Sequence, residues 1–507
     1  MKAAVGIDNV LPLSPIGSKP RNILLVDLNN FASFPTLAVG IITASLRNHG
    51  YRVQMISPLA YDVPAAERER AETFVDHLQR RIHLSTFAPL RAARDGLRRA
   101  RDWYRNRPHP RVLSEVAKAL RDKPDAILLS AYLQHHSTVR EVGKLARDAG
   151  VPLVLGGPAF SQPGTIEAWR TIPGLSLIAG AEADLMLPSL ISTLLDKGDL
   201  TAFPGVTLPE GPVRPAAPPL RNLDASPVPD FTDFPWDRYP VRIIPMMASR
   251  GCQWNKCNFC SDIVSVSGRT YRNRSLDSVL HEMREQAARH ATQNFLFLDL
   301  KLNSNPALFR GIIENAQRVV RGAQWIGTVH VDLRPDNGLS RADLRAAASA
   351  GLRRVSFGLE SGSQRMLDLM DKGCSVEANS QFIRHAHEAG ISVRSTMFKG
   401  YPGETAEDLE MTADFLEAHL PYIDRIRYNE FSILSGTPIY ERMVGNDEAY
   451  PSLHTLRTDD RNARLWYRNS ETGGRAYRKA KSRVLDLVFA INKRKIRSSA
   501  RVFDGLM

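Results

Sequence analysis

The stretch SRGCQWNKCNFCSD, residues 249–262, holds three of the four cysteines in a chain of 507 residues. Cys252, Cys257 and Cys260 follow the spacing C-x4-C-x2-C and come directly after an apolar, strand-like run at 242–249. Thiols this close together favour a soft metal ion or an iron–sulfur cluster. The alternative is a zinc site with a distant fourth ligand, either a histidine or Cys374. A cluster held by three cysteines would keep one iron open for a substrate or cofactor.

Strand-like runs alternate with helical patterns after these cysteines. The run at 242–249 is followed by five more, at 294–300, 324–331, 352–360, 392–400 and 425–434. Six strand–helix units predict a partial (β/α)6 barrel, whose chemistry would lie at the C-terminal ends of the strands.

The N-terminal half shows the same alternation and predicts a separate, doubly wound Rossmann or flavodoxin-like domain. Its first strand-like run is RNILLVDL at 21–28. Ligands of such sheets bind at the carboxyl ends of the strands. In this chain those ends are predicted at 27–30, 132–137, 156–158 and 180–182.

Composition shifts predict the domain boundaries. Residues 1–20 read as a loose tail, 21–203 as the first domain with an Arg-rich helical insertion at 61–123, and 241–440 as the barrel. Residues 204–240 carry ten of the 32 prolines and predict a linker wrapped over the surface. Residues 441–507 are expected to form a basic helical region, with Val484, Leu487, Val488 and Ile491 on one helical face.

The net charge of +13 is concentrated in two segments. Residues 80–111 carry ten Arg against two Asp, and residues 473–501 carry ten Lys or Arg against Asp486. Both segments are either solvated helix faces or contact surfaces for an acidic peptide, a lipid head group or a nucleic acid. Nucleic acid is the weaker option because few aromatic residues accompany the charge.

The chain is expected to be cytoplasmic. No run of about 18 apolar residues predicts a membrane span, and the N-terminal residues lack a secretory signal pattern. Four cysteines, three of them clustered, do not form the framework of a disulfide-rich secreted protein.

The barrel region resembles the radical S-adenosylmethionine (SAM) enzymes. Besides the cysteines, it contains, in the family order, SRGC at 249–252, RNRS at 272–275, FLDLKLNSN at 297–305, FGLESGS at 357–363, KGYPGET at 399–405 and SGTPIY at 435–440. The resemblance implies a [4Fe–4S] cluster on Cys252, Cys257 and Cys260, with SAM on the open iron. The commonest family spacing is C-x3-C-x2-C, so this chain has one additional residue. The implied SAM-site residues are Phe259, Asp299, Glu360, Ser361, Gly400 and Glu404.

The first domain resembles the cobalamin-binding domain that precedes the barrel in a large class of these enzymes. The matching pieces are FPTLAVGIITASLRNHGYRV, VPLVLGGPAF and LIAGAEADLMLPSLI. The D-x-H-x-x-G motif is absent, and G-A-E-A at 180–183 replaces the usual G-E-G-E. His135 or His136 below the cobalt is a minor alternative to loop contacts. The implied cobalamin contacts are Asn29, Asn30, Tyr132, Gly156, Gly157 and Glu182.

The resemblance implies a cobalamin-dependent radical SAM enzyme, with C-methylation of an unactivated carbon as its expected reaction. The substrate class would be a natural product, a peptide or a lipid-like molecule, and the electron donor a flavodoxin or ferredoxin. The alternatives are cyclisation, rearrangement or oxygen insertion with the same cofactors, and a non-catalytic metal-binding sensor. Cys374 is expected to be a packed thiol rather than a catalytic one.

Overall fold

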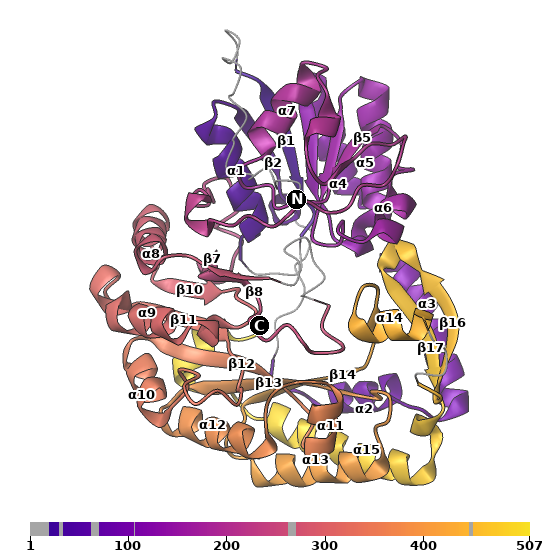
Figure 1. Ribbon diagram of the computed structural model, residues 1–507, viewed down its shortest axis with the longest axis vertical. Helices are drawn as coiled ribbons and strands as arrows, with labels where there is room; N and C mark the ends of the chain where they lie inside the picture. The colour runs from indigo at the N-terminus through magenta and orange to yellow at the C-terminus, as the bar shows by residue number, and fades with distance from the viewer. Residues whose placement is uncertain are drawn as a thin grey trace, which may run out of the picture. The chain divides into compact units, whose positions relative to one another are not determined.

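A computed structural model of the chain describes residues 20–29, 34–61, 70–105, 107–261, 270–445 and 450–506. These residues form two compact units (Figure 1). Within the described ranges, the first unit contains 20–61 and 107–240, and the second contains 70–105, 241–261 and 270–506. Both units are built on parallel sheets, so the predicted α/β class and two-domain architecture are confirmed.

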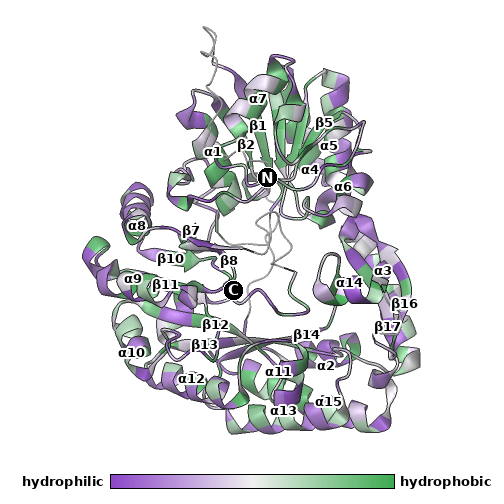
Figure 2. Cartoon of the chain, in the orientation of Figure 1, coloured by the Kyte–Doolittle hydropathy of each residue, from purple (hydrophilic) through white to green (hydrophobic). Residues whose placement is uncertain are grey.

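The first unit has a six-stranded sheet in the order β2-β1-β3-β4-β5-β6. All neighbours are parallel except β5 and β6. The central strands are buried almost throughout, as expected when helices cover both faces of a sheet (Figures 1 and 2). The strands are β1 Asn22–Asp27, β2 Arg52–Ile56, β3 Ala126–Ser130, β4 Leu153–Gly156, β5 Leu175–Ala179 and β6 Val206–Thr207. The α-helices are α1 Leu37–Asn48, α4 Pro110–Ala119, α5 His136–Ala149, α6 Pro163–Trp169 and α7 Leu187–Leu195.

The Pro-rich segment 204–240 belongs to the first unit, and the boundary between the units follows Pro240. Its Asp230 donates a backbone hydrogen bond to the Gly40 carbonyl of α1 at 2.9 Å and accepts one from the Arg47 guanidinium at 2.7 Å. Phe231 is fully buried. The segment therefore packs on the first unit.

The second unit is organised around a six-stranded parallel sheet whose spatial order, β7-β10-β11-β12-β13-β14, is also its chain order. Among the described strands no pairing joins β7 to β14, so the predicted partial barrel is confirmed. The strands are β7 Ile244–Met246, β10 Asn294–Phe297, β11 Gln324–Thr328, β12 Leu352–Glu360, β13 Ser392–Lys399 and β14 Arg425–Glu430. The helices that alternate with them are α8 Leu276–His290, α9 Pro306–Val319, α10 Arg341–Ser349, α11 Gln364–Leu369, α12 Val376–Glu388 and α13 Ala406–Ala418.

The Arg-rich insertion differs from its predicted place. The sequence placed all of 61–123 in the first domain, whereas residues 70–105 belong to the second unit as helices α2 Phe74–His83 and α3 Ala88–Arg105. The reason is packing against the C-terminal helix α15 Arg475–Asn492. The His77 ring stacks on Phe489 with 4.6 Å between centroids, and Lys481 donates to the Leu84 carbonyl at 2.9 Å.

The C-terminal region is only partly helical, which corrects the prediction for 441–507. An antiparallel sheet in the order β15-β17-β16 precedes α15; its strands are β15 Ile433–Leu434, β16 Leu453–Asp459 and β17 Arg464–Asn469. Arg457 of β16 lies across from Trp466 of β17, 5.3 Å from its ring centroid, and Arg464 on the same strand as Trp466 lies 4.4 Å from it. A short helix, α14 Pro438–Gly445, links β15 to this hairpin.

The basic charge of α15 is largely used within the second unit. Arg483 pairs with Glu410, Asp414 and Glu417 of α13 at 2.9, 2.6 and 2.5 Å. Val484, Val488 and Ile491 are fully buried, as predicted for one apolar face, but Leu487, predicted on the same face, is only partly buried, and Leu485 is buried instead. The second basic segment is therefore mainly a packing element. No helix in the described part of the chain is long and apolar enough to span a membrane.

Asn492 links α15 to the edge strand β14. Its side chain accepts from the Ile426 amide and donates to the Ile426 carbonyl, both at 2.8 Å, and also donates to Glu72. It thus completes hydrogen bonds that a further strand would otherwise make.

We expect Asn492→Ala to lower the free energy of unfolding by roughly 2–3 kcal/mol, because it leaves buried backbone groups of β14 unsatisfied. Chemical denaturation measures this change. Asn462→Ala is the matched control, since the Asn462 side chain bonds only to Asp459 within one turn. An equal loss in both variants would contradict the role assigned to Asn492.

Candidate active site

The cysteine loop begins at a tight backbone approach. Strands β8 Ser249–Gly251 and β9 Tyr271–Asn273 form a short antiparallel pair immediately before Cys252. Gly251 has φ of +84°, and a Cβ atom there would lie 1.6 Å from the Thr270 carbonyl oxygen. Only glycine fits this position, so backbone packing explains why a glycine precedes Cys252 in the SRGC motif.

The three cysteines of the loop are half-buried and carry no disulfide, whereas Cys374 is fully buried. The pKa of Cys257 is raised to about 11, because the effect of burial outweighs the opposite effect of the nearby Lys372 ammonium. A thiol held protonated in this way becomes a thiolate ligand when a metal displaces its proton.

The donor set fits an iron–sulfur cluster better than zinc. Three thiols on one loop are the soft ligands that iron–sulfur clusters use. A cluster spaces its ligands by its own size, and three ligands leave its fourth iron open.

The cysteine loop packs on the backbone at the end of α11 and on the turn that follows it. The Trp254 indole donates to the Asp371 carbonyl at 2.7 Å, and the Asn258 amide group donates to the Leu369 carbonyl at 3.1 Å. The Asn258 backbone amide donates to the Met370 carbonyl at 3.0 Å. Trp254 is thus an anchor that fixes the loop between the first two thiols.

Glu360 and Lys372 form a buried ion pair beside the cysteine loop. The Lys372 ammonium lies 3.1 Å from the Glu360 carboxylate and 5.6 Å from the Phe259 ring centroid. Glu360 closes β12 with φ of +59°, a conformation that costs about 1 kcal/mol or more for a residue with a side chain. Burial raises its pKa, while Lys372 favours the carboxylate. Phe259, Glu360 and Lys372 therefore share one environment, as the predicted roles of Phe259 and Glu360 require.

Asp299 braces the start of the cysteine loop. It is buried, and its carboxylate accepts hydrogen bonds from the Ala248 amide at 3.0 Å and from the Ser249 hydroxyl. Burial raises its pKa to about 6. In this arrangement Asp299 positions the β7–β8 segment, so its influence on a bound cofactor would pass through the loop.

The remaining SAM-site candidates are engaged in local structure. The Ser361 hydroxyl lies 3.1 Å from the Thr412 hydroxyl. The Glu404 carboxylate accepts from the Gly400 amide at 2.6 Å and from the Tyr477 hydroxyl. These contacts close the turn after β13 and tie it to α15. Gly400 leaves its own carbonyl to accept from Asn469 at 3.2 Å.

A ring of charged side chains at the strand ends was not predicted from the sequence. Lys301 pairs with Asp332, whose carboxylate also accepts from Arg334 at 3.0 Å. Arg334 in turn donates to Gln253 of the cysteine loop at 2.8 Å and to the Ser304 carbonyl at 2.9 Å. The loop is thereby joined to the segments that follow β10 and β11. Lys301 lies inside the quoted FLDLKLNSN motif, which could have indicated it.

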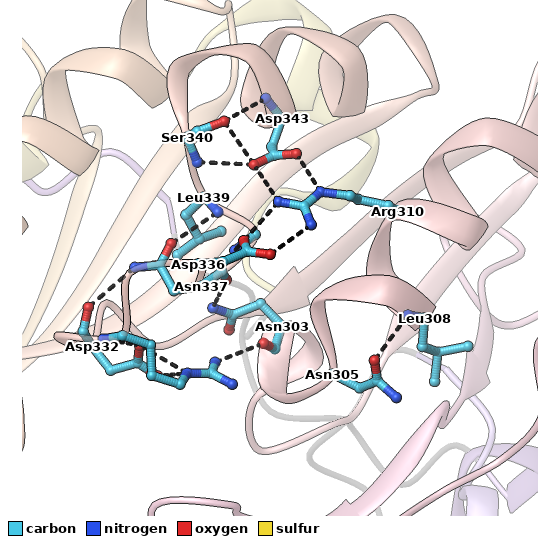
Figure 3. Close-up of polar contacts among 12 residues, drawn as sticks. Asn303, Asn305, Leu308, Arg310, Asp332, Asp336, Asn337, Leu339, Ser340 and Asp343 are labelled. Carbon is cyan, nitrogen blue, oxygen red and sulfur yellow. Dashed lines mark hydrogen bonds and ion pairs between the residues drawn. The ribbon is translucent and has the colours of Figure 1, made fainter.

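The loop after β11 is held by a second polar network (Figure 3). Arg310 of α9 bridges Asp336 and Asp343 with bonds of 2.7–3.2 Å, and Asn303 donates to the Asn337 carbonyl at 2.8 Å. Asn303 also exchanges two 3.0 Å hydrogen bonds with the His330 backbone. Burial, with Lys372 and Lys301 nearby, holds the pKa of His330 well below its ordinary value, so its imidazole is neutral.

The candidate cobalamin contacts share one edge of the first sheet. Asp27, Ser130, Gly156 and Ala179 are paired in register across β1, β3, β4 and β5. The candidates at or just beyond this row are Asn29, Tyr132, Gly156, Gly157 and Glu182, while Asn30 lies outside the described residues. The sequence thus placed separate segments at one common edge.

Several of these candidates already have structural partners. The Asn29 amide donates to Thr36 at 3.1 Å, and Glu182 accepts from the Leu220 amide at 2.7 Å. A Cβ atom at Gly157 would lie 2.3 Å from the Ala131 carbonyl oxygen, so strand packing alone requires glycine there. Burial lowers the pKa of His135 to about 4, which leaves a neutral imidazole beside Tyr132.

Residues 246–416 match the family model described as the Radical SAM superfamily. The match contains the three clustered cysteines and all six of the predicted SAM-site residues. The second unit therefore carries a radical SAM domain, which implies a [4Fe–4S] cluster and SAM.

Three curated relatives cover both methyltransferases and a cyclase. The chain is 26% identical over 350 residues to an uncharacterized methyltransferase of Pyrococcus horikoshii, covering 66% of this chain and 73% of the relative. It is 26% identical over 234 residues to the bacteriochlorophyllide d C-12(1)-methyltransferase of Chlorobaculum tepidum, covering 44% and 48%. It is 28% identical over 313 residues to the anaerobic magnesium-protoporphyrin IX monomethyl ester cyclase of Rubrivivax gelatinosus, covering 57% and 53%. The chain thus spans about half the length of the last two.

Two solved structures share the fold across both units. The radical SAM methyltransferase TsrM of Kitasatospora setae, with cobalamin and a [4Fe–4S] cluster bound, is 14% identical with a TM-score of 0.64, covering 95% of this chain and 90% of that one. The cobalamin-dependent SAM radical enzyme OxsB is 17% identical with a TM-score of 0.67, covering 92% and 66%. At this identity the likeness establishes the fold.

We expect Cys257→Ala to lose the cluster and with it all reductive cleavage of SAM, because two thiols cannot replace three. Iron analysis and 5′-deoxyadenosine formation after anaerobic reconstitution measure both effects. Cys374→Ala is the matched control, since this buried thiol lies outside the loop, and it should keep its iron. Wild-type SAM cleavage by Cys257→Ala would contradict the assignment.

Glu404 predicts a pH dependence of stability. Burial raises its pKa from 4.5 to about 7 in the folded protein. The folded state therefore binds a proton that the unfolded chain has released, and stability falls as the pH rises from about 4.5 through 7. Glu404→Gln should remove a decrease on the order of 3 kcal/mol, measured as unfolding free energy against pH. Glu407→Gln, an exposed position on α13, should retain the decrease, and identical profiles for both variants would contradict the prediction.

Proposed function

We propose that this chain, a radical SAM enzyme with the fold of the cobalamin-dependent members of that superfamily, is a C-methyltransferase. Its substrate would be a natural product, a peptide or a lipid-like molecule, and the methyl group would be transferred to an unactivated carbon of it. The proposal rests on two features found in the same chain. The second unit carries a three-cysteine loop at the ends of its strands, and the strands of the first unit end in one in-register row. The methyltransferases of Pyrococcus and Chlorobaculum named above support the reaction class.

The cofactors supply the chemistry that side chains lack: a reduced [4Fe–4S] cluster delivers the electron that cleaves SAM, and cobalamin carries the methyl group. The chain holds and orients them. Cys252, Cys257 and Cys260 would ligate the cluster. The Glu360–Lys372 pair places a carboxylate beside the loop, where it could accept hydrogen bonds from the ribose hydroxyls of SAM. Phe259, packed against Phe398 with centroids 5.1 Å apart, would shield the cluster from water.

Asn29, Tyr132, Gly156, Gly157 and Glu182 would contact cobalamin at the carboxyl edge of the first sheet, as parallel sheets bind ligands there. Asn30 is part of the same proposal. The electron donor would be a flavodoxin or ferredoxin. The proposed location is the cytoplasm, where a reducing environment keeps thiols available to ligate a cluster.

Cyclisation or another cobalamin-dependent rearrangement is the second candidate. It is favoured by the 28% identity to the Rubrivivax cyclase over 313 residues. The two reactions differ in their use of SAM, since methyl transfer also converts SAM to S-adenosylhomocysteine.

The decisive test is anaerobic turnover of the reconstituted enzyme with hydroxocobalamin, a reduced flavodoxin and SAM labelled in its methyl group, so that every methyl group on cobalamin comes from the labelled SAM. A small-molecule and peptide extract from cells that lack the enzyme serves as the substrate mixture. We expect S-adenosylhomocysteine and 5′-deoxyadenosine together, and a product that has gained one labelled methyl group. Mass spectrometry detects all three.

A product that forms together with 5′-deoxyadenosine but carries no label would favour cyclisation or rearrangement over methylation. Cys257→Ala is the negative control for SAM cleavage. Glu360→Gln tests the proposed carboxylate: it keeps the size of the side chain, so iron content should be unchanged while the KM for SAM rises. Tight binding of one zinc ion in place of iron would overturn the enzyme proposal altogether.

A further inference from the structure

The exposed apolar side chains of this chain are concentrated in helices α2 and α3. Nine of the fourteen large hydrophobic residues that are exposed among the described residues lie in this one segment. Between 44% and 72% of each is exposed, and they are Phe74, Val75, Leu78, Ile82, Phe87, Leu90, Leu97, Trp103 and Tyr104. Scattered exposed apolar residues need no explanation, but a concentration of this kind marks an interaction site.

Helix α2 is oriented opposite to an ordinary surface helix. The one residue that it buries is His77, which stacks on Phe489 of α15, and Arg81 pairs with Asp486 at 2.7 Å on the same side. Val75, Leu78 and Ile82 lie on another face and are exposed, and Phe74 is exposed as well although its ring edge contacts Phe489 at 6.3 Å between centroids. Leaving these apolar side chains in water forgoes the free energy that their burial would contribute.

Helix α3 adds further exposed apolar residues and positive charge. Leu90, Leu97 and Tyr104 are spaced seven residues apart, so they lie on one face of the helix, and Leu97 is the most exposed at 72%. Arg99 and Arg101 are also exposed. Residues 74–105 carry eight Arg against three Asp. Aromatic residues stand at the end of the helix, at Trp103 and Tyr104.

We propose that this α2–α3 surface, the nine apolar residues with Arg99 and Arg101, docks on an anionic membrane surface. The apolar side chains would enter the boundary between head groups and acyl chains, and the arginines would pair with lipid phosphates. Trp and Tyr are the residues that favour this boundary. A strongly amphipathic helix of low overall hydrophobicity lies on a membrane rather than across it.

The charge of the surface selects this partner over two others. A second copy of the chain would bring one arginine-rich face against another, and like charges at such an interface repel. A nucleic acid would use the arginines and aromatic rings but would gain nothing from exposed Leu78, Ile82, Leu90 and Leu97. A lipid surface uses both the charge and the aliphatic side chains.

The inference is independent of the proposed reaction. The α2–α3 surface contains none of the cysteines or candidate cofactor contacts, so membrane binding and catalysis can be tested separately. Peripheral docking would bring the second unit to apolar substrates dissolved in a membrane.

Co-sedimentation of the full chain with vesicles tests the proposal. We expect binding to vesicles of phosphatidylglycerol mixed with phosphatidylcholine, and little binding to phosphatidylcholine alone. Leu78→Gln combined with Leu97→Gln should weaken the partition coefficient at least about tenfold, because two inserted side chains are lost. Arg99→Gln combined with Arg101→Gln should weaken it on the anionic vesicles. NaCl at about 1 M should also weaken it, since the Debye length is then about 3 Å.

The matched control is Leu333→Gln combined with Leu456→Gln, two exposed leucines outside the surface, which should bind as the wild type does. Iron content and SAM cleavage should be unchanged in all three double variants, which confirms that they fold. Absence of binding, equal binding to both kinds of vesicle, or wild-type binding by the Leu78/Leu97 variant would overturn the proposal. A vesicle-free dimer that this variant disrupts in analytical ultracentrifugation would also overturn it, in favour of a second copy.

Discussion

The candidate active site depends on how one irregular loop is held in place. Residues 252–260 form no helix or strand, so the positions of the three thiols are set by bonds to other segments. Trp254 and Asn258 attach the loop to the backbone of residues 369–371, and Arg334 attaches Gln253 to the segments after β10 and β11. A cluster needs its ligands in fixed positions, and here the barrel supplies that rigidity from two sides.

The same turn that anchors the loop also carries Lys372. One short segment between α11 and α12 therefore fixes Trp254 and places an ammonium group between Cys257, Glu360 and Phe259. The buried pair is also costly to disrupt, since removing one partner would leave the other charge unpaired in a dry environment.

Of the two basic segments, one is a packing element and the other an open surface. Both have a similar excess of charge in the sequence, and composition alone offers no way to distinguish them. In the C-terminal segment, Arg483 faces three carboxylates of α13, and the apolar face of α15 is buried. In α2 and α3 the apolar residues face outward instead. The difference lies in which partner each helix meets, which is a property of the folded chain.

Local pattern was sufficient for the parallel strands of the two α/β units, the cysteine motif and the shared edge of the first sheet. Strand periodicity and motif order are properties of contiguous residues, so they can be read directly from the sequence. Tertiary structure decided the rest. The insertion joined the second unit because His77 and Leu84 meet α15 some 400 residues later. The hairpin 453–469 joins the second unit through the pairing of β17 with β15, some 30 residues earlier. Asp299 and Glu404 became braces because they are buried beside backbone amides. Such contacts join residues far apart in the chain, and no local pattern encodes which of them will meet.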